Sequence, residues 1–158
     1  MFDSYNVLKM LHILGVILLV GNVTITASWK VYADFSRDPR IIAHAQRSVA
    51  WADWLWTLMG ITLVSVGGYG AALVQGIPLF SDFWMLAGQG LFLLSGLIWL
   101  GLIVPIQVKQ GRAAREFALS GTIPPEYWRL SNWWMVWGVA ATIPLLAAIW
   151  VMVAKPAW

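Results

Sequence analysis

Residues 5–29 read YNVLKMLHILGVILLVGNVTITASW, and this stretch decides the fold. The segment from Asn6 to Trp29 is 24 residues long and mostly apolar. At about 1.5 Å of rise per residue, a helix of this length crosses a hydrocarbon core of roughly 30 Å. His12 then lies inside the bilayer. Because an ionisable side chain at that depth is costly, we take His12 as a candidate functional residue.

One face of this first helix differs from the others. Steps of three and four residues from His12 lead to Gly15, Leu19, Asn22 and Thr26. The residues off that face are apolar: Leu11, Leu14, Leu18 and Ile25. Residues at these spacings share one side of a helix. The pattern predicts that the His12 face contacts protein and that the opposite face contacts lipid.

The composition of the whole chain agrees with a membrane location. Of 158 residues, 60% are hydrophobic and 11% are charged, with a mean hydropathy of +0.74. A water-soluble domain needs more polar surface than this. The absence of Cys excludes disulfides, iron–sulfur clusters and thiolate nucleophiles. The basic residues are spread over two loops and the aromatic residues lie in lipid-length runs, so we expect no nucleic-acid partner.

Four apolar segments of membrane length are predicted: residues 6–29, 52–74, 83–108 and 133–153. The predicted fold is all-α, a single integral membrane domain over residues 1–158 built as an antiparallel bundle of four transmembrane helices. Glycine, serine and threonine residues of the second and third spans are expected to make the helix contacts. Asp38-Pro39 is typical of a helix start, and residues 110–119 are expected to form a separate surface helix.

Lysine and arginine residues are distributed unevenly between the connections. The two long connections hold four each, namely Lys30, Arg37, Arg40 and Arg47, then Lys109, Arg112, Arg115 and Arg129. The short turn at residues 75–82 holds none. Basic loops stay on the cytoplasmic side of a membrane. The pattern predicts a multi-pass protein of a bacterial cytoplasmic (inner) membrane with both termini outside.

In this topology, three polar side chains are expected at one depth. His12 is six residues inside the first span, Gln89 six inside the third, and Tyr69 six before Gln75. Met85 lies one turn nearer the outer surface. The sequence therefore predicts an outer-leaflet site of His12, Tyr69, Gln89 and Met85. Two interpretations stay open here: a ligand or cofactor pocket, or a buried histidine satisfied by hydrogen bonds across the bundle.

Several other kinds of site receive little support. His44 lies 25 residues before Tyr69, about 37 Å along a continuous helix, so it is not expected to share a haem iron with His12. Asp53 and Asp82 are placed at the entrances of spans, so no carboxylate relay is predicted. Two distant histidines without Cys make a zinc or copper site weak, and no nucleophile–base pair indicates a hydrolase.

Short motifs in this chain resemble known membrane families. They are Lys9-x-x-His12 in the first helix, Arg47 before the second, YWRLSN at 127–132, Pro144, and VMVAKP at 151–156. In these motifs the chain resembles HemJ-type and related CopD-like four-helix membrane proteins. Through HILGVILLVGN and VGGYG it resembles, over nearly its whole length, a bacterial family of predicted integral membrane proteins of unknown function.

The HemJ resemblance implies a b-type haem held by the first-helix histidine, here His12, and a protoporphyrinogen-oxidising activity. The lysine of that pattern near the start of the third helix is missing from WMLAGQ at 84–89. The resemblance therefore implies the scaffold and the iron ligand, and it leaves the enzymatic step open. The CopD-like resemblance implies copper uptake, for which this chain supplies few methionines and histidines.

Two functions follow from these observations. One is a haem b protein that takes part in electron transfer or in redox chemistry of a quinol or porphyrin-like partner, with His12 as the axial ligand and Met85 or Gln89 at the sixth position. The alternative is a non-enzymatic carrier or assembly partner whose outer-leaflet pocket holds a small apolar or lipid-like ligand. Whether the chain is an enzyme stays open. The expected partners are the lipid bilayer, one such small molecule, and a second copy of the chain.

Overall fold

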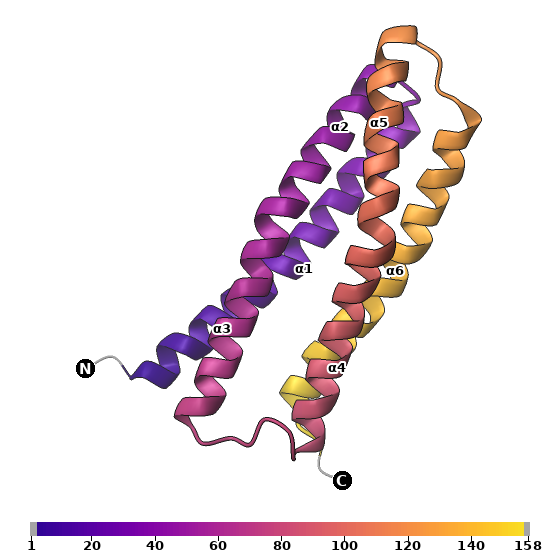
Figure 1. Cartoon of the computed structure of the whole chain (residues 1–158). Coiled ribbons are helices and arrows are strands. Elements are labelled where there is room, and N and C mark those ends of the chain that lie inside the picture. The colour runs from indigo at the N-terminus through magenta and orange to yellow at the C-terminus, as the bar shows by residue number, and fades with distance from the viewer. Residues whose placement is uncertain (1–2, 157–158) are drawn as a thin grey trace. The chain divides into compact units, whose positions relative to one another are not determined.

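The computed structural model describes residues 3–156, and its regular structure over that range is entirely helical. The elements are α1 (Ser4–Ser36), α2 (Pro39–Ala52), η1 (Asp53–Thr57), α3 (Leu58–Val74), α4 (Phe83–Ile98), η2 (Trp99–Ile103), α5 (Val104–Ser120) and α6 (Pro125–Ala154), where η1 and η2 are π-helical segments. Because α2, η1 and α3 are continuous, as are α4, η2 and α5, the chain forms four long helices (Figure 1). Each is long and apolar enough to cross a membrane. The all-α fold class with four spans is confirmed.

The reversal between the first two long helices depends on two residues. Arg37 ends α1 in the left-handed region with φ 53°, and its N–H donates to the carbonyl of Asp34. Asp38 caps α2, because its side-chain oxygen accepts from the backbone N–H groups of Arg40 at 2.7 Å and Ile41 at 3.2 Å. Pro39 then occupies the first helical turn, where its missing N–H costs nothing. The predicted start at Asp38-Pro39 is confirmed.

The helices extend well beyond the predicted spans into the basic connections. The second long helix begins at Pro39, 13 residues before the predicted residue 52. The third continues to Ser120, 12 residues past 108, and ends at Gly121 with φ 76°. Residues 110–119 therefore continue a membrane helix, and the prediction of a separate surface helix was wrong. Hydropathy marks the part of a helix that suits lipid, and a helix does not have to end where the lipid does.

Of the two π-helical segments, η2 has a clear local cause. Pro105 follows it, and a proline inside a helix removes one backbone hydrogen bond and crowds the carbonyl four residues earlier. That carbonyl belongs to Gly101, which lies within η2 (Trp99–Ile103). The wider π turn relieves the crowding. The η1 segment holds no proline and instead carries two buried polar residues, Asp53 and Thr57.

The chain separates into two compact units, one ending at Pro78 and one beginning at Leu79. In unit 1, α1 packs against α2, η1 and α3; in unit 2, α6 packs against α4, η2 and α5. Each unit is a hairpin of two long antiparallel helices. The association of all four helices into one domain over residues 1–158 stays a prediction.

In unit 1, α1 and α3 approach each other closely through glycine residues. A Cβ at Gly15 would lie 2.6 Å from the backbone nitrogen of Val64 and 2.9 Å from the carbonyl oxygen of Gly60. A Cβ at Gly67 would collide with the backbone of His12 and Leu8. Small residues let membrane helices pack with their backbones nearly in contact. The predicted role of the second-span glycines is confirmed.

In unit 2, α4 and α6 make fewer close contacts of this kind. A Cβ at Gly88 would meet the end of the Met152 side chain, and Ser95, seven residues later, donates a hydrogen bond of 2.8 Å to the carbonyl of Ala141. A Cβ at Gly90, Gly96 or Gly101 would meet open space. Within unit 2, Gly88 is thus the α4 glycine in close contact with α6, and the predicted helix contacts of the other three stay a prediction.

Candidate functional site

The inner face of α1 is the one that the sequence predicted. Gly15, Leu19 and Thr26 are buried, whereas Leu14 and Ile25, on the opposite side, are 44% and 50% exposed. The burial pattern thus separates a face packed on protein from a face open to the surroundings, and His12 and Asn22 lie half-buried at the edge of the packed face.

The His12 ring is held by the backbone of α3. Its Nδ1 lies 2.8 Å from the carbonyl oxygen of Val64. A carbonyl oxygen only accepts, so Nδ1 carries the proton and donates it, and in the neutral ring the lone pair is then on Nε2. A Cβ at Gly68 would lie 2.7 Å from Nδ1 and 3.0 Å from Cε1. The absence of a side chain at Gly68 therefore makes room for the ring. Across residues 3–156, no other hydrogen-bond partner contacts His12.

The residues predicted around His12 fall into two groups. Tyr69 follows Gly68 on α3, next in the chain to the glycine beside the His12 ring, and its side chain is 43% exposed. Gln89 and Met85 lie in unit 2. Gln89 Nε2 donates to the carbonyl of Leu79 at 2.8 Å and to that of Met85 at 3.2 Å. Met85 itself is buried, with 7% of its surface exposed. The grouping of all four residues in one pocket stays a prediction.

Unit 1 also contains a polar cluster that sequence reasoning missed. Asn22 Nδ2 donates to Asp53 Oδ1 at 2.9 Å and to Thr57 Oγ1 at 3.2 Å. Asp53 is 7% exposed and Thr57 is 6% exposed. Asp53 was predicted at the entrance of a span, and in the structure it is buried 14 residues after the start of its helix at Pro39. The signal was present: Asn22 lies on the polar face of α1, and Thr57 lies four residues after Asp53.

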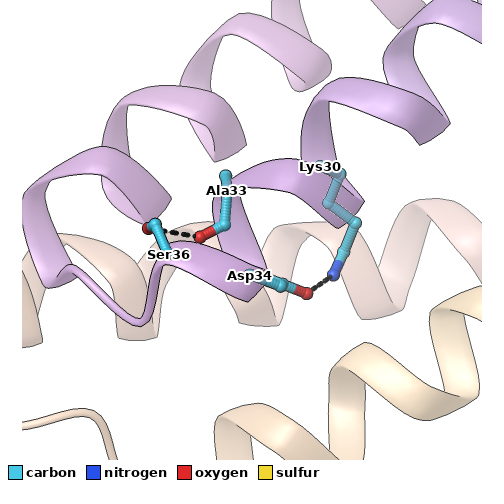
Figure 2. Close-up of polar contacts among 4 residues, drawn as sticks. All are labelled: Lys30, Ala33, Asp34 and Ser36. Carbon is cyan, nitrogen blue, oxygen red and sulfur yellow. Dashed lines mark hydrogen bonds and ion pairs between the residues drawn. The ribbon is translucent and has the colours of Figure 1, made fainter.

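A buried ion pair lies further along the same face of α1. Lys30 is 1% exposed, and its Nζ contacts Asp34 Oδ2, four residues later, at 2.5 Å, as Figure 2 shows. Close by, the Ser36 hydroxyl donates to the carbonyl of Ala33 at 2.6 Å. The sequence placed Lys30 in a polar connection, and this was wrong because α1 continues to Ser36.

The two remaining titratable residues singled out in unit 1 lie at the surface. His44 is exposed on α2, and Lys9 is exposed on α1 with its Nζ 5.6 Å from the centre of the Tyr5 ring. Among residues 3–156, no group of three or more His, Cys, Asp or Glu residues is close enough to hold a metal ion.

The model of a known protein family matches nearly the whole chain. Residues 6–156 match the model of a family described as "Predicted integral membrane protein (DUF2269)". The chain belongs to this family. Comparisons with curated proteins and with solved structures find no match.

Membership of DUF2269 and the four long apolar helices together establish a multi-pass integral membrane protein with four spans. The predicted resemblance to a family of integral membrane proteins is confirmed. The likeness to HemJ-type and CopD-like proteins stays a prediction.

Proposed function

We propose that this DUF2269 protein holds a b-type haem through His12 and takes part in electron transfer, or in the redox chemistry of a quinol or porphyrin-like molecule. One observation carries the proposal. His12 donates its Nδ1 proton to the carbonyl of Val64 at 2.8 Å, and histidines that bind metals usually donate their other ring nitrogen in this way. The donation leaves the Nε2 lone pair for an iron atom.

Unit 1 supplies, in His12, the side-chain ligand that a haem iron requires from the protein. A porphyrin supplies the in-plane ligands of its iron, so a single imidazole is enough to hold the metal from the protein side. The Val64 carbonyl fixes the tautomer and orientation of the His12 ring, and Gly68 leaves the ring the room it occupies. When bound, the haem would supply one-electron redox chemistry.

The remaining assignments belong to the same proposal. Met85 or Gln89 would occupy the sixth position or modify it, and Tyr69 would border the site from α3. The distribution of lysine and arginine supports a bacterial cytoplasmic membrane with both termini outside. Reporter fusions after Gln75 and after Gln110 test this orientation, and the first should report outside and the second inside.

A second function is supported by the same hydrogen bond. The contact from His12 to Val64 joins α1 to α3, so His12 is also suited to fixing the helix register in a non-enzymatic carrier or assembly partner with a pocket for a small apolar or lipid-like ligand. In that case, His12→Ala would weaken the association of α1 with α3 by about 1 kcal/mol. It would leave the visible spectrum unchanged.

The visible spectrum of the purified protein separates the two functions. Expressed with ample haem, the wild-type protein should show a Soret band, and His12→Ala should lose it. His44→Ala is the matched control, since His44 is the other histidine of the chain and is exposed on α2. A wild-type protein without a Soret band, or a His12→Ala variant that retains it, would rule out the haem proposal.

A further inference from the structure

The second long helix of unit 1 presents one exposed face that runs from α2 into its membrane-spanning part (Figure 1). Exposed residues recur there at steps of three and four: Arg40, His44, Arg47, Trp51, Leu55 and Leu58. Residues at these spacings share one side of a helix. On the other side of α2, which packs on α1, Ile42 and Val49 are at most 1% exposed. The exposed side of α2 is therefore the side that continues into the lipid-facing surface of the span.

The chemistry of this exposed side changes at Trp51, which is 68% exposed. The exposed residues before Trp51 include two arginines and a histidine, and those after it are aromatic or apolar. Tryptophan at such a border lies at the level of the lipid headgroups. Arg47 is four residues nearer the helix start, about 6 Å along the axis. A headgroup layer is roughly 5–7 Å thick on each side of the hydrocarbon core, so Arg47 lies within reach of lipid phosphates.

The basic residues of this side have no acidic neighbour on their own helix. The α2 sequence PRIIAHAQRSVAWA contains no Asp or Glu, and Asp38, which precedes it, accepts from the backbone of Arg40 as the helix cap. Among residues 3–156, no hydrogen bond or ion pair engages the side chains of Arg40, His44 or Arg47. A guanidinium group donates two parallel hydrogen bonds to a phosphate. This side of α2 thus offers positive charge and open donors.

Unit 2 contains an arginine at the same spacing from a tryptophan, but with an acidic partner. Arg129 precedes the exposed Trp133 by four residues, as Arg47 precedes Trp51. Arg129 Nη2 lies 3.4 Å from Glu126 Oε1. Because the carboxylate offsets the charge of Arg129, this position attracts an anion less strongly than Arg47 does. Arg129 is therefore a matched comparison for Arg47.

We propose that the side of α2 formed by Arg40, His44, Arg47 and Trp51 binds an anionic phospholipid. Arg47 and His44 contact the headgroup phosphate, Arg40 adds positive charge two turns further out, and Trp51 packs on the upper part of the acyl chains. Basic residues next to a membrane span attract anionic lipids in this way. The proposal does not depend on haem binding by His12 or on which side of the membrane α2 faces.

Native mass spectrometry of the full-length protein, released from detergent micelles, tests the proposal. Phosphatidylglycerol and phosphatidylcholine with the same acyl chains are added in turn, and the lipids bound to each protein molecule are counted. We expect the wild-type protein to bind phosphatidylglycerol in preference to phosphatidylcholine. Arg47→Gln should reduce that preference several-fold, because one positive charge at the headgroup level is lost. Arg47→Lys, which keeps the charge, should retain most of it.

The matched control is Arg129→Gln, which removes the same charge from unit 2 and should change the preference much less. Equal binding of the two lipids by the wild-type protein would overturn the proposal, and so would an equal effect of Arg47→Gln and Arg129→Gln. Loss of the preference when inorganic phosphate is added would show a site for soluble anions instead. A preference confined to dimers would assign this side of α2 to contact with a second copy of the chain.

Discussion

The two units are both hairpins of long apolar helices, but they are held together differently. In unit 1, α1 and α3 meet at glycines whose backbones nearly touch, and His12 lies at this interface. Asn22 hydrogen-bonds Asp53 and Thr57 where α1 packs on the adjoining segment η1. In unit 2, the buried residues of α4 and α6 are mostly apolar, and Ser95 donates a hydrogen bond to the carbonyl of Ala141. Close glycine packing fixes the register of a helix pair, and a fixed register lets polar groups from two helices keep hydrogen-bonding distance. In unit 1, interhelical polar contacts therefore accompany the closest packing of the helices.

The largest effect is expected at the glycine where backbone meets backbone. A side chain at Gly67 would collide with the backbone of His12 and Leu8, which has no rotamer to change. Gly67→Ala should therefore separate α1 from α3 and destabilise the protein by about 3 kcal/mol, the upper end of the range typical of overpacked sites. Unfolding in mixed detergent measures the change. A variant as stable as the wild type would show that the close approach of α1 and α3 is not what holds unit 1.

A smaller effect is expected at the corresponding position of unit 2. A side chain at Gly88 would meet the end of Met152, and methionine adapts its shape easily. Gly88→Ala should cost about 1 kcal/mol or less in the same unfolding experiment. If Gly88→Ala proved as harmful as Gly67→Ala, the contrast between the two units would be lost.

The polar contacts provide the next comparison. Asn22→Leu removes two interhelical hydrogen bonds and Ser95→Ala removes one. Such bonds contribute about 0.6 kcal/mol each on average in membrane proteins, so Asn22→Leu should cost about 1 kcal/mol and Ser95→Ala about half of that. A double-mutant cycle of Asn22→Leu with Asp53→Asn should show coupling between the two residues, and additive effects would contradict the contact.

The smallest effect is expected at glycines without neighbours. A Cβ at Gly90 would meet open space, and alanine is favoured over glycine inside helices by up to about 1 kcal/mol. Gly90→Ala should leave the stability unchanged or increase it slightly. A clear loss of stability would indicate that this face of α4 is covered by another part of the assembled protein.

The sequence was sufficient for the features that depend on local pattern. The four spans follow from hydropathy, the inner face of α1 from the spacing of Gly15, Leu19 and Thr26, and the α2 start from Asp38-Pro39. These need only the helical period and the chemistry of a helix cap. The hydrogen bond from His12 to Val64 could not be predicted, since it depends on how α1 and α3 are offset.

The features that the sequence missed have two physical origins. Asp53 and Lys30 were read as boundary residues because they are charged, whereas each lies inside a helix and makes polar contacts there. The hydrogen bonds from the Gln89 amide to the carbonyls of Leu79 and Met85 were not predicted, and its grouping with His12 stays a prediction. The glycines of α4 could not be ranked, because their number does not reveal which of them faces α6.

The central claim is that Nδ1 of His12 donates a proton and that Nε2 keeps its lone pair for a ligand. Nitrogen-15 solid-state NMR of histidine-labelled His44→Ala protein in bilayers tests it directly, because His12 is then the single histidine of the chain. In protein prepared without haem at neutral pH, we expect a protonated Nδ1 and an unprotonated Nε2. A spectrum with the proton on Nε2 would contradict the hydrogen bond to Val64 and the haem ligand proposed from it.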